Sequence, residues 1–98
     1  MILRLRITPR AARDLQHIQD YLVARNPAGA DKVRLRIVNA LDVLCEFPFT
    51  GRPTVRSDVL MTLVTKYRYK IYYSVGDDEV QIVHIRHPAR REPGADEL

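Results

Sequence analysis

Residues 2–7 alternate between apolar and charged side chains, with Leu3, Leu5 and Ile7 on one side and Arg4 and Arg6 on the other. This two-residue period is typical of a half-buried β-strand, because successive side chains of a strand point to opposite faces of a sheet. We therefore predict a first strand whose apolar face packs on a core and whose other face is cationic.

A pair of helices is predicted next. Thr8-Pro9 begins the first helix, since threonine caps a helix N-terminus and proline is tolerated at the first helical position. Asn26-Pro27 repeats this signal, so the first helix ends near residues 24–25 and a second one continues to about Glu46, before Pro48. Both segments carry apolar residues at steps of three and four: Ala11, Leu15, Ile18 and Leu22, then Ala30, Val33, Ile37, Leu41 and Leu44. The two helices should form a hairpin with one apolar side.

The second half of the chain has the pattern of three strands. An apolar run covers residues 59–64, the clearest alternation covers residues 67–75, and a further apolar segment covers residues 80–87 after the turn Gly76-Asp77-Asp78. In the middle strand, one face is predicted to gather the side chains of Tyr67, Tyr69, Ile71, Tyr73 and Val75. The element order predicts an α+β fold, β-α-α-β-β-β, in which a helical hairpin covers one face of an antiparallel sheet.

Two segments lack any periodicity. Residues 47–53 contain Gly and Pro and are predicted to form an irregular loop, with Phe47 and Phe49 anchored to the core. Residues 89–98 are charged and marked by Gly and Pro, so they are expected to form a flexible tail.

Composition narrows the class of protein. The 98 residues suit one domain, residues 1–98, and the 46% of hydrophobic residues suit a packed globule. Cys45 is the only cysteine and falls beside the apolar stripe of the second helix, where we interpret it as a core residue rather than a nucleophile. Because no leader-like or membrane-spanning run and no set of metal ligands occurs, we expect a cytoplasmic protein without membrane contact, metal or cofactor.

The net charge of +4 favours an anionic partner, and the positions of the cations along the chain indicate which surface would bind it. If the helices cover the apolar face of the sheet, strand parity places five cations on the other face: Arg4, Arg6, Lys66, Arg68 and Lys70. Such a row can bind phosphates, and Tyr72, on the same face by parity, could stack on a base. The alternative is a solvated face whose cations only keep an edge strand from aggregating.

A second group of cations and histidines closes the last strand. It consists of His84, Arg86, His87, Arg90 and Arg91. Histidine can transfer protons near neutral pH and arginine can stabilise a phosphorane, so this mixture could cut RNA. In a regular strand, however, His84 and Arg86 share one face and His87 takes the other, so both histidines can serve one site only if the strand bulges. The alternative is a strand end with local hydrogen bonds and no chemistry.

Four sequence words, in order, resemble the ParE/RelE superfamily of toxins from bacterial type II toxin-antitoxin systems. They are residues 8–15, similar to "(S/T)P-x-A-x-x-D-L"; residues 47–53, similar to "FP-x-x-G-R-P"; residues 67–75, similar to "YRI-x-Y-x-V"; and residues 83–90, similar to a closing "hxhhHxxR". The resemblance covers almost the whole chain. It implies a growth-inhibiting toxin, of a kind associated with plasmid stabilisation, held inactive by a cognate antitoxin.

Members of this superfamily differ in their target. RelE-like toxins cut mRNA on the ribosome, and the residues carried over from them would be the cations Lys66, Arg68 and Arg86, with His87 as the proton-transfer residue. ParE-like toxins inhibit DNA gyrase and have no nuclease site. No tyrosine follows Tyr73, so the C-terminal tyrosine of several RelE-like nucleases has no counterpart. The resemblance therefore favours a non-enzymatic gyrase inhibitor.

Two other readings stay open at this point: a ribosome-dependent mRNA endoribonuclease, and a non-toxic basic binding module. The residues expected to bind an anionic partner are Arg4, Arg6, Lys66, Arg68, Lys70, Arg86 and Arg90. The helical hairpin and the exposed sheet surface are expected to contact the antitoxin, because a small toxin has few other places to bury a partner.

Overall fold

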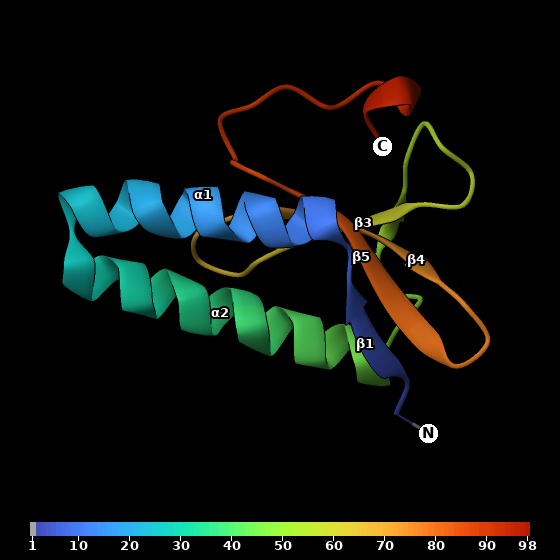
Figure 1. Ribbon diagram of the computed structural model, residues 1–98. Coiled ribbons are helices and arrows are strands. Elements are labelled where there is room, and N and C mark those ends of the chain that lie inside the picture. Colours follow the sequence, from blue (N-terminus) through green and yellow to red (C-terminus); the bar gives the residue numbers. More distant parts are fainter. Residues whose placement is uncertain (1) are drawn as a thin grey trace.

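The helical hairpin forms as its caps predict. The computed structural model describes residues 2–98, and in it β1 (Arg4–Ile7) leads into α1 (Pro9–Arg25) and α2 (Pro27–Glu46) (Figure 1). The Thr8 hydroxyl accepts a hydrogen bond from the Ala11 N–H, and the Asn26 side chain accepts one from the Gly29 N–H. Each cap satisfies a backbone donor that the first turn leaves free, and each is followed by proline at the start of the helix. No helix within residues 2–98 is long and apolar enough to cross a membrane.

The sheet has five strands rather than four. After α2 come β2 (Arg52–Pro53), β3 (Leu60–Leu63), β4 (Lys70–Val75) and β5 (Glu79–Arg86), and a 3-10 turn, η1 (Ala95–Glu97), ends the chain. The strand order is β1-β5-β4-β3-β2. The α+β class and the helical hairpin are confirmed, but the sheet is mixed, because β1 pairs with β5 in parallel. The hairpin carries the chain from β1 at one edge of the sheet to β2 at the other edge, and the strands β3, β4 and β5 then bring it back beside β1, so β5 runs parallel to β1.

The core fills the space between the hairpin and one face of the sheet. From α2 it takes Val33, Ile37, Leu41, Leu44 and Cys45, and from the sheet Ile71, Tyr73, Val80, Ile82 and Ile85. All of these side chains are buried, which confirms the apolar stripe of the second helix and the core position of Cys45. The face of the sheet opposite this core is called the open face below.

The first strand is less buried than its pattern predicts. Leu5 and Ile7 remain 39% and 38% exposed, and every residue of β1 is exposed. The prediction of an apolar face packed on the core is wrong for these two residues, because β1 is a four-residue strand at the edge of the sheet.

The strand around Tyr72 begins later than expected. Lys66 and Arg68 have φ angles of 76° and 60°, in the left-handed region, and the Arg68 N–H bonds to the Val64 carbonyl. They therefore lie in a turn between β3 and β4, and strand parity does not apply to them. Left-handed backbone is uncommon for residues with a Cβ, so this turn stores strain.

A bulge in β5 changes which residues face the core. Tyr72 pairs with His84 and Tyr73 with Ile82, which leaves Val83 as an extra residue. Val80 and Ile82 lie in the core before the bulge, and Ile85 does so after it. His84 and Arg86 are therefore turned toward the open face, beside Tyr72 and Lys70.

The loop before β2 is held by a tyrosine rather than by its phenylalanines. Phe47 and Phe49 are 54% and 76% exposed, so their predicted anchoring role is wrong. Instead the buried Tyr73 hydroxyl donates to the Pro48 carbonyl and accepts from the Gly51 N–H, at 2.8 and 3.0 Å.

Gly51→Ala is expected to destabilise the protein. A Cβ at Gly51 would overlap the Tyr73 hydroxyl and lie 3.0 Å from the Met61 carbonyl oxygen, so both hydrogen bonds of Tyr73 would be disturbed. We expect a loss of about 2–3 kcal/mol in the free energy of unfolding, measured by urea denaturation. Gly76→Ala is the control, because its Cβ would meet no atom closer than 3.6 Å. Equal losses in the two variants would contradict the prediction.

Candidate functional site

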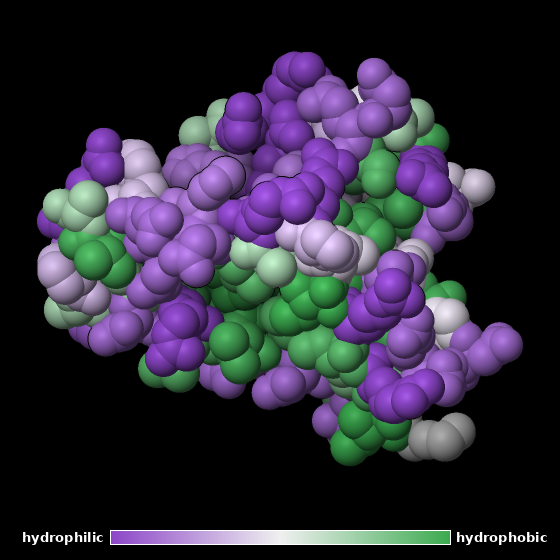
Figure 2. All heavy atoms as spheres, viewed as in Figure 1, coloured by the Kyte–Doolittle hydropathy of each residue, from purple (hydrophilic) through white to green (hydrophobic). Residues whose placement is uncertain are grey.

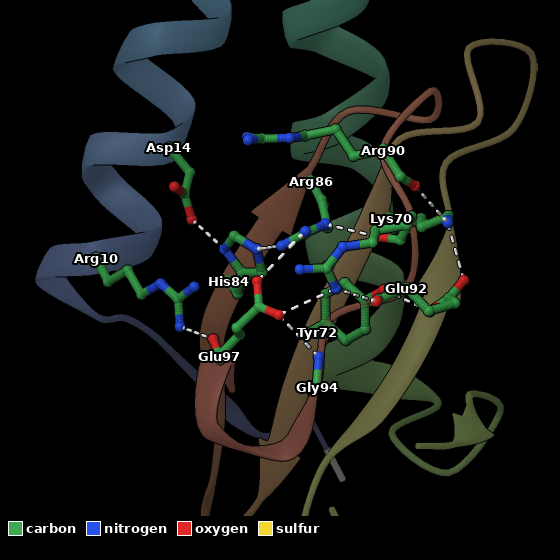
Figure 3. A network of polar contacts seen from close by, with 11 residues as sticks. Arg10, Asp14, Lys70, Tyr72, His84, Arg86, Arg90, Glu92, Gly94 and Glu97 are labelled. Carbon is green, nitrogen blue, oxygen red and sulfur yellow. Dashed lines mark hydrogen bonds and ion pairs between the residues drawn. The ribbon is translucent and has the colours of Figure 1, made fainter. Parts of the chain in front are cut away.

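The C-terminal segment, residues 88–98, returns across the open face of the sheet (Figure 3). Residues 89–98 were expected to form a flexible tail, but in the structure Pro93 is buried, and the Glu92 carboxylate and the Arg91 carbonyl accept hydrogen bonds from side chains of β4 and β5. The open-face cluster, defined as Lys70, Tyr72, His84 and Arg86, lies beneath it.

Glu92 contacts two members of the open-face cluster. Its carboxylate accepts hydrogen bonds from Lys70 Nζ and from the Tyr72 hydroxyl, both at 2.8 Å. The hydrogen bond from Lys70, followed by that from Tyr72, holds the pKa of Glu92 below its usual value. Burial, together with the neighbouring Glu92 carboxylate, raises the pKa of the Tyr72 hydroxyl well above its usual value, so Tyr72 is a hydrogen-bond donor here. Tyr72 lies on this face, as strand parity predicted, but it is fully buried, so its ring is not available to stack on a base as the sequence had suggested it could.

Arg86 is the buried cation of the cluster, with 7% of its surface exposed. Its guanidinium donates to the Arg91 carbonyl at 2.9 Å and lies 3.5 Å from the Glu97 carboxylate. Arg10 of α1 donates to the backbone carbonyl of Glu97. The tail thus presents a main-chain oxygen and a carboxylate to Arg86, and a main-chain oxygen to Arg10.

His84 and Asp14 hold Arg86 in place through a chain of hydrogen bonds. Arg86 Nη1 lies 3.1 Å from His84 Nε2, and because a guanidinium can only donate, Nε2 is the acceptor. The proton of the neutral ring is then on Nδ1, which lies 2.7 Å from the Asp14 carboxylate (Figure 3). The ring of His84 also stacks on Tyr72 with a centroid separation of 5.6 Å. The chain from Asp14 through His84 to Arg86 fixes the position of the guanidinium.

Asp14 is itself held as a carboxylate. Burial raises its pKa, but hydrogen bonds from His84 and from the Ile85 N–H outweigh that effect, and the net pKa lies below its usual value. Asp14 belongs to the motif of residues 8–15, but nothing in the sequence indicates that it pairs with His84, which lies 70 residues further along the chain. Asp14, Glu92 and Glu97 are members of the site that no sequence pattern indicated.

The predicted row of cations is not one continuous surface. Arg4 pairs with Asp78 at 2.6 Å, and Arg6 lies 3.9 Å from Glu79. Lys70 and Arg86 pair with the tail glutamates, as described above. Lys66 and Arg68 lie in the turn between β3 and β4, where the alternation of strand side chains between two faces does not apply. Three of the five cations in the predicted row, Arg4, Arg6 and Lys70, therefore have a carboxylate beside them.

His87 points to the opposite side of the sheet from Arg86. Its ring packs edge-on against Tyr69, a core residue, at a centroid separation of 5.5 Å. It lines a surface depression together with Lys66, Tyr67 and residues of the two helices. The bulge at Val83 precedes both histidines, so they still point to opposite sides, as the sequence predicted.

The residues carried over from RelE-like toxins are consequently divided between two places. Lys66 and His87 share the depression on the helix side, whereas Arg86 belongs to the open-face cluster. Arg90 and Arg68 are exposed. Within residues 2–98, no three His, Cys, Asp or Glu side chains are grouped so that they could hold a metal ion.

An apolar groove runs between the two helices and reaches β1. It has a volume of about 390 Å³, and Figure 2 shows the apolar surface in the gap between α1 and α2. Its apolar lining includes Ile7, Leu15, Ile18, Val33, Ile37 and Val38. A small protein rarely leaves a continuous apolar groove open to water unless a partner covers it. The apolar stripes of the helices were visible in the sequence, but the groove that they form together with Ile7 was not.

Comparisons with known proteins agree on one family. Residues 5–92 match the family model described as the ParE toxin of the type II toxin-antitoxin system, parDE. The chain is 42% identical to a protein named toxin RelE2 from Caulobacter vibrioides over 83 residues, which covers 85% of this chain and 92% of the relative.

Two solved structures share the fold. One, described as the chromosomal ParDE TA system from P. aeruginosa, superposes with a TM-score of 0.78 at 27% identity and covers 88% of this chain and 96% of that one. The other, the toxin-antitoxin complex RelBE2 from Mycobacterium tuberculosis, has a TM-score of 0.63 at 21% identity and covers 92% of this chain and 95% of that one. The second likeness concerns the fold alone.

Proposed function

Because the chain belongs to the ParE toxin family of type II toxin-antitoxin systems, we propose that it inhibits growth by binding DNA gyrase and that a cognate antitoxin neutralises it. The separation of Arg86 from His87 is the observation that favours gyrase binding over RNA cleavage. A nuclease needs its proton-transfer residue and its phosphate-binding cation around one reacting phosphate. Here Arg86 is committed to His84 and the tail on the open face, and His87 packs on Tyr69 on the other side.

A cationic surface supports an anionic target such as a gyrase-DNA complex. Lys32 and Arg36 of α2 line shallow depressions together with Lys66 of the β3–β4 turn. Among residues 2–98 these three cations form no ion pair with a carboxylate, unlike the cations of the open-face cluster. An unpaired cation can contribute its full attraction to an approaching phosphate.

One observation favours a second candidate, a ribosome-dependent mRNA endoribonuclease. Lys66 and His87 line the same depression beside Tyr67, which is a possible place for a nucleotide, and the 42% identical relative bears the name RelE2. In this reading His87 would transfer the proton and Lys66 would bind the phosphate.

Purified toxin is expected to inhibit DNA supercoiling by gyrase, and His87→Ala is expected to inhibit it as strongly as the wild type. His87 is exposed just after β5, so its removal takes away one edge-on contact with Tyr69 and no buried side chain. Supercoiling on relaxed plasmid and cleavage of mRNA on purified ribosomes are measured in parallel. Unchanged gyrase activity at saturating toxin would sink the proposal. Ribosome-dependent cleavage that His87→Ala abolishes would establish the second candidate instead.

The antitoxin is proposed to cover the apolar groove between α1 and α2. An amphipathic helix bound there would place its apolar face against Leu15, Ile18 and Val38, as in other complexes of a helix with a hydrophobic groove. The solved relative at 27% identity is a ParDE toxin-antitoxin system, which supports a partner of this kind for the present chain.

A further inference from the structure

A furrow runs along one side of α2, between that helix and the turn that joins β3 to β4. It is made of three adjoining depressions, with volumes of about 480, 340 and 330 Å³. Lys32, Lys66 and Tyr67 line both the first and the second depression, and Arg36 and Asn39 line both the second and the third. These shared residues join the three depressions into one surface, called the α2 furrow below.

The α2 furrow is nearly as long as the helix beside it. Its lining begins at Asn26, the N-cap of α2, and reaches Val43 and Leu44 near the C-terminal end of the helix. At a rise of 1.5 Å per residue, these positions span roughly 27 Å. A surface of this length suits a linear polymer better than a single small molecule.

The charged side chains that line the α2 furrow are all cations. Lys32, Arg36 and Lys66 are exposed, and no aspartate or glutamate in the part of the chain that the structure describes lines any of the three depressions. Arg36 donates to the neutral hydroxyl of Thr65 at 3.4 Å, a contact that leaves its charge uncompensated. Cations in such surroundings attract a phosphate backbone, since no neighbouring carboxylate opposes the approach of an anion.

An aromatic ring lies in the middle of the α2 furrow, beside one of these cations. Tyr67 is half-buried, and Lys66 Nζ lies 5.4 Å from the centre of its ring. The φ angle of Lys66, 76°, places the backbone strain of the turn at the point where the cation meets the ring. Proteins hold single-stranded nucleic acids with these two parts, cations for the phosphates and an aromatic face for a base.

This combination fits a single strand better than a duplex or an acidic peptide. Phosphates and bases alternate along a strand, and the α2 furrow offers a partner for each. In a duplex the bases are stacked inside and do not reach an aromatic ring at the protein surface. An acidic peptide would neutralise the cations but would bring no flat base to Tyr67.

We propose that the α2 furrow binds a single strand of DNA, with phosphates on Lys32, Arg36 and Lys66 and one base on the ring of Tyr67. This inference deepens the proposed function, on which its choice of DNA over RNA rests. The toxin then holds DNA itself, in addition to the enzyme that acts on the DNA.

Salt dependence tests the contacts to phosphate. The probe is a fluorescein-labelled dodecathymidine, and its binding to the purified toxin is followed by fluorescence anisotropy at several salt concentrations. We expect the logarithm of the association constant to fall with the logarithm of the salt concentration with a slope of about −2, because each phosphate neutralised on a single strand contributes about 0.7. Arg36→Gln should weaken binding about 5-fold at about 50 mM salt and make the slope shallower by about 0.7.

Arg34→Gln is the matched control for Arg36→Gln. Arg34 is an exposed arginine on the same helix, but it lines the groove toward α1 instead of the α2 furrow. Arg34→Gln removes the same charge and should bind dodecathymidine as the wild type does. Equal losses of affinity in the two variants would overturn the proposal, since net charge alone would then explain the binding.

Substitution of Tyr67 tests the contact to a base. Tyr67→Leu should weaken binding of dodecathymidine about 10-fold without changing the slope against salt, and Tyr67→Phe should bind as the wild type does, because stacking needs the ring and not the hydroxyl. Tyr67 packs partly against the core, so thermal denaturation is used to verify that both variants fold. Wild-type affinity in a folded Tyr67→Leu variant would overturn the proposal.

Unlabelled competitors test the choice of ligand. We expect a DNA duplex of the same length and a dodecaglutamate to compete at least about 10-fold more weakly than dodecathymidine, and equal competition by either would overturn the proposal. Competition by dodecauridine that is about 10-fold stronger would overturn the choice of DNA and favour the nuclease candidate. These assays contain no gyrase. Loss of supercoiling without DNA binding would therefore refute the furrow site alone, and DNA binding without an effect on gyrase would refute the proposed target alone.

Discussion

Val38→Asp is expected to abolish neutralisation by the cognate antitoxin while leaving the toxin folded and toxic. Val38 lines the apolar groove between α1 and α2 and is 41% exposed, so the aspartate is hydrated in the free toxin. A bound antitoxin helix would bury that carboxylate against apolar side chains without a partner, which is costly. We expect about 100-fold weaker binding, which corresponds to about 2.8 kcal/mol, measured by calorimetry and by growth during co-expression.

Val43→Asp is the matched control for this prediction. Val43 lies on the same helix and is 53% exposed, but it belongs to a different depression, beside Thr50 and Thr62. It introduces the same charge at a similar exposure. If Val43→Asp weakened the antitoxin as much as Val38→Asp, net charge would explain the loss and the groove would not be the docking site. If neither variant weakened it, the antitoxin would bind elsewhere.

Local signals in the sequence were enough to predict the helical hairpin. The cap-plus-proline pairs Thr8-Pro9 and Asn26-Pro27 determine helix starts through contacts within three residues. The apolar stripe of α2 can leave water only by packing against the sheet. Ile37, in the middle of this stripe, is part of the core. Such features depend on neighbours in the sequence, so no knowledge of distant residues was needed.

Strand parity failed where the backbone departed from a regular strand. The alternation from Tyr67 to Val75 correctly grouped Tyr69, Ile71 and Tyr73 in the core. It did not reveal that Lys66 and Arg68 adopt left-handed backbone, because no glycine marks that turn. The parallel pairing of β1 with β5 depends on chain topology, which periodicity does not encode.

The site depended most on contacts between distant parts of the chain. The charges of Arg86 and Lys70 were visible in the sequence, but their partners Glu97 and Glu92 lie in a segment whose composition predicted a flexible tail. Gly and Pro in that segment were interpreted as signs of disorder. In the structure, Pro93 packs against the open face and Gly94 leads into η1. Composition alone does not distinguish a free tail from one that binds its own sheet.

Asp14→Asn is expected to lower the stability of the protein at neutral pH by about 1–3 kcal/mol, and the difference from the wild type should shrink in acid. The Asp14 carboxylate accepts hydrogen bonds from the His84 ring and from the Ile85 N–H, at 2.7 and 3.1 Å, and neutral asparagine can replace only part of this. His84, Ile85 and Arg10 together hold the pKa of Asp14 below its usual value despite burial. Because the folded-state pKa is depressed, the contribution of Asp14 is fully present well above pH 3.8, the usual value of the group.

That contribution must then disappear as the pH falls from about 3.8 through the lowered folded-state pKa, since protonation removes the preference of the folded state for the carboxylate. Urea denaturation between pH 7 and the most acidic pH at which both proteins stay folded measures the difference directly. Asp20→Asn is the control, because Asp20 lies on the same helix and contacts only the exposed Gln16 side chain. A pH-independent difference for Asp14→Asn would mean that packing around residue 14, rather than its charge, supports His84. A difference that grows at neutral pH and vanishes in acid would instead link α1 electrostatically, through His84, to the buried Arg86 of the open-face cluster.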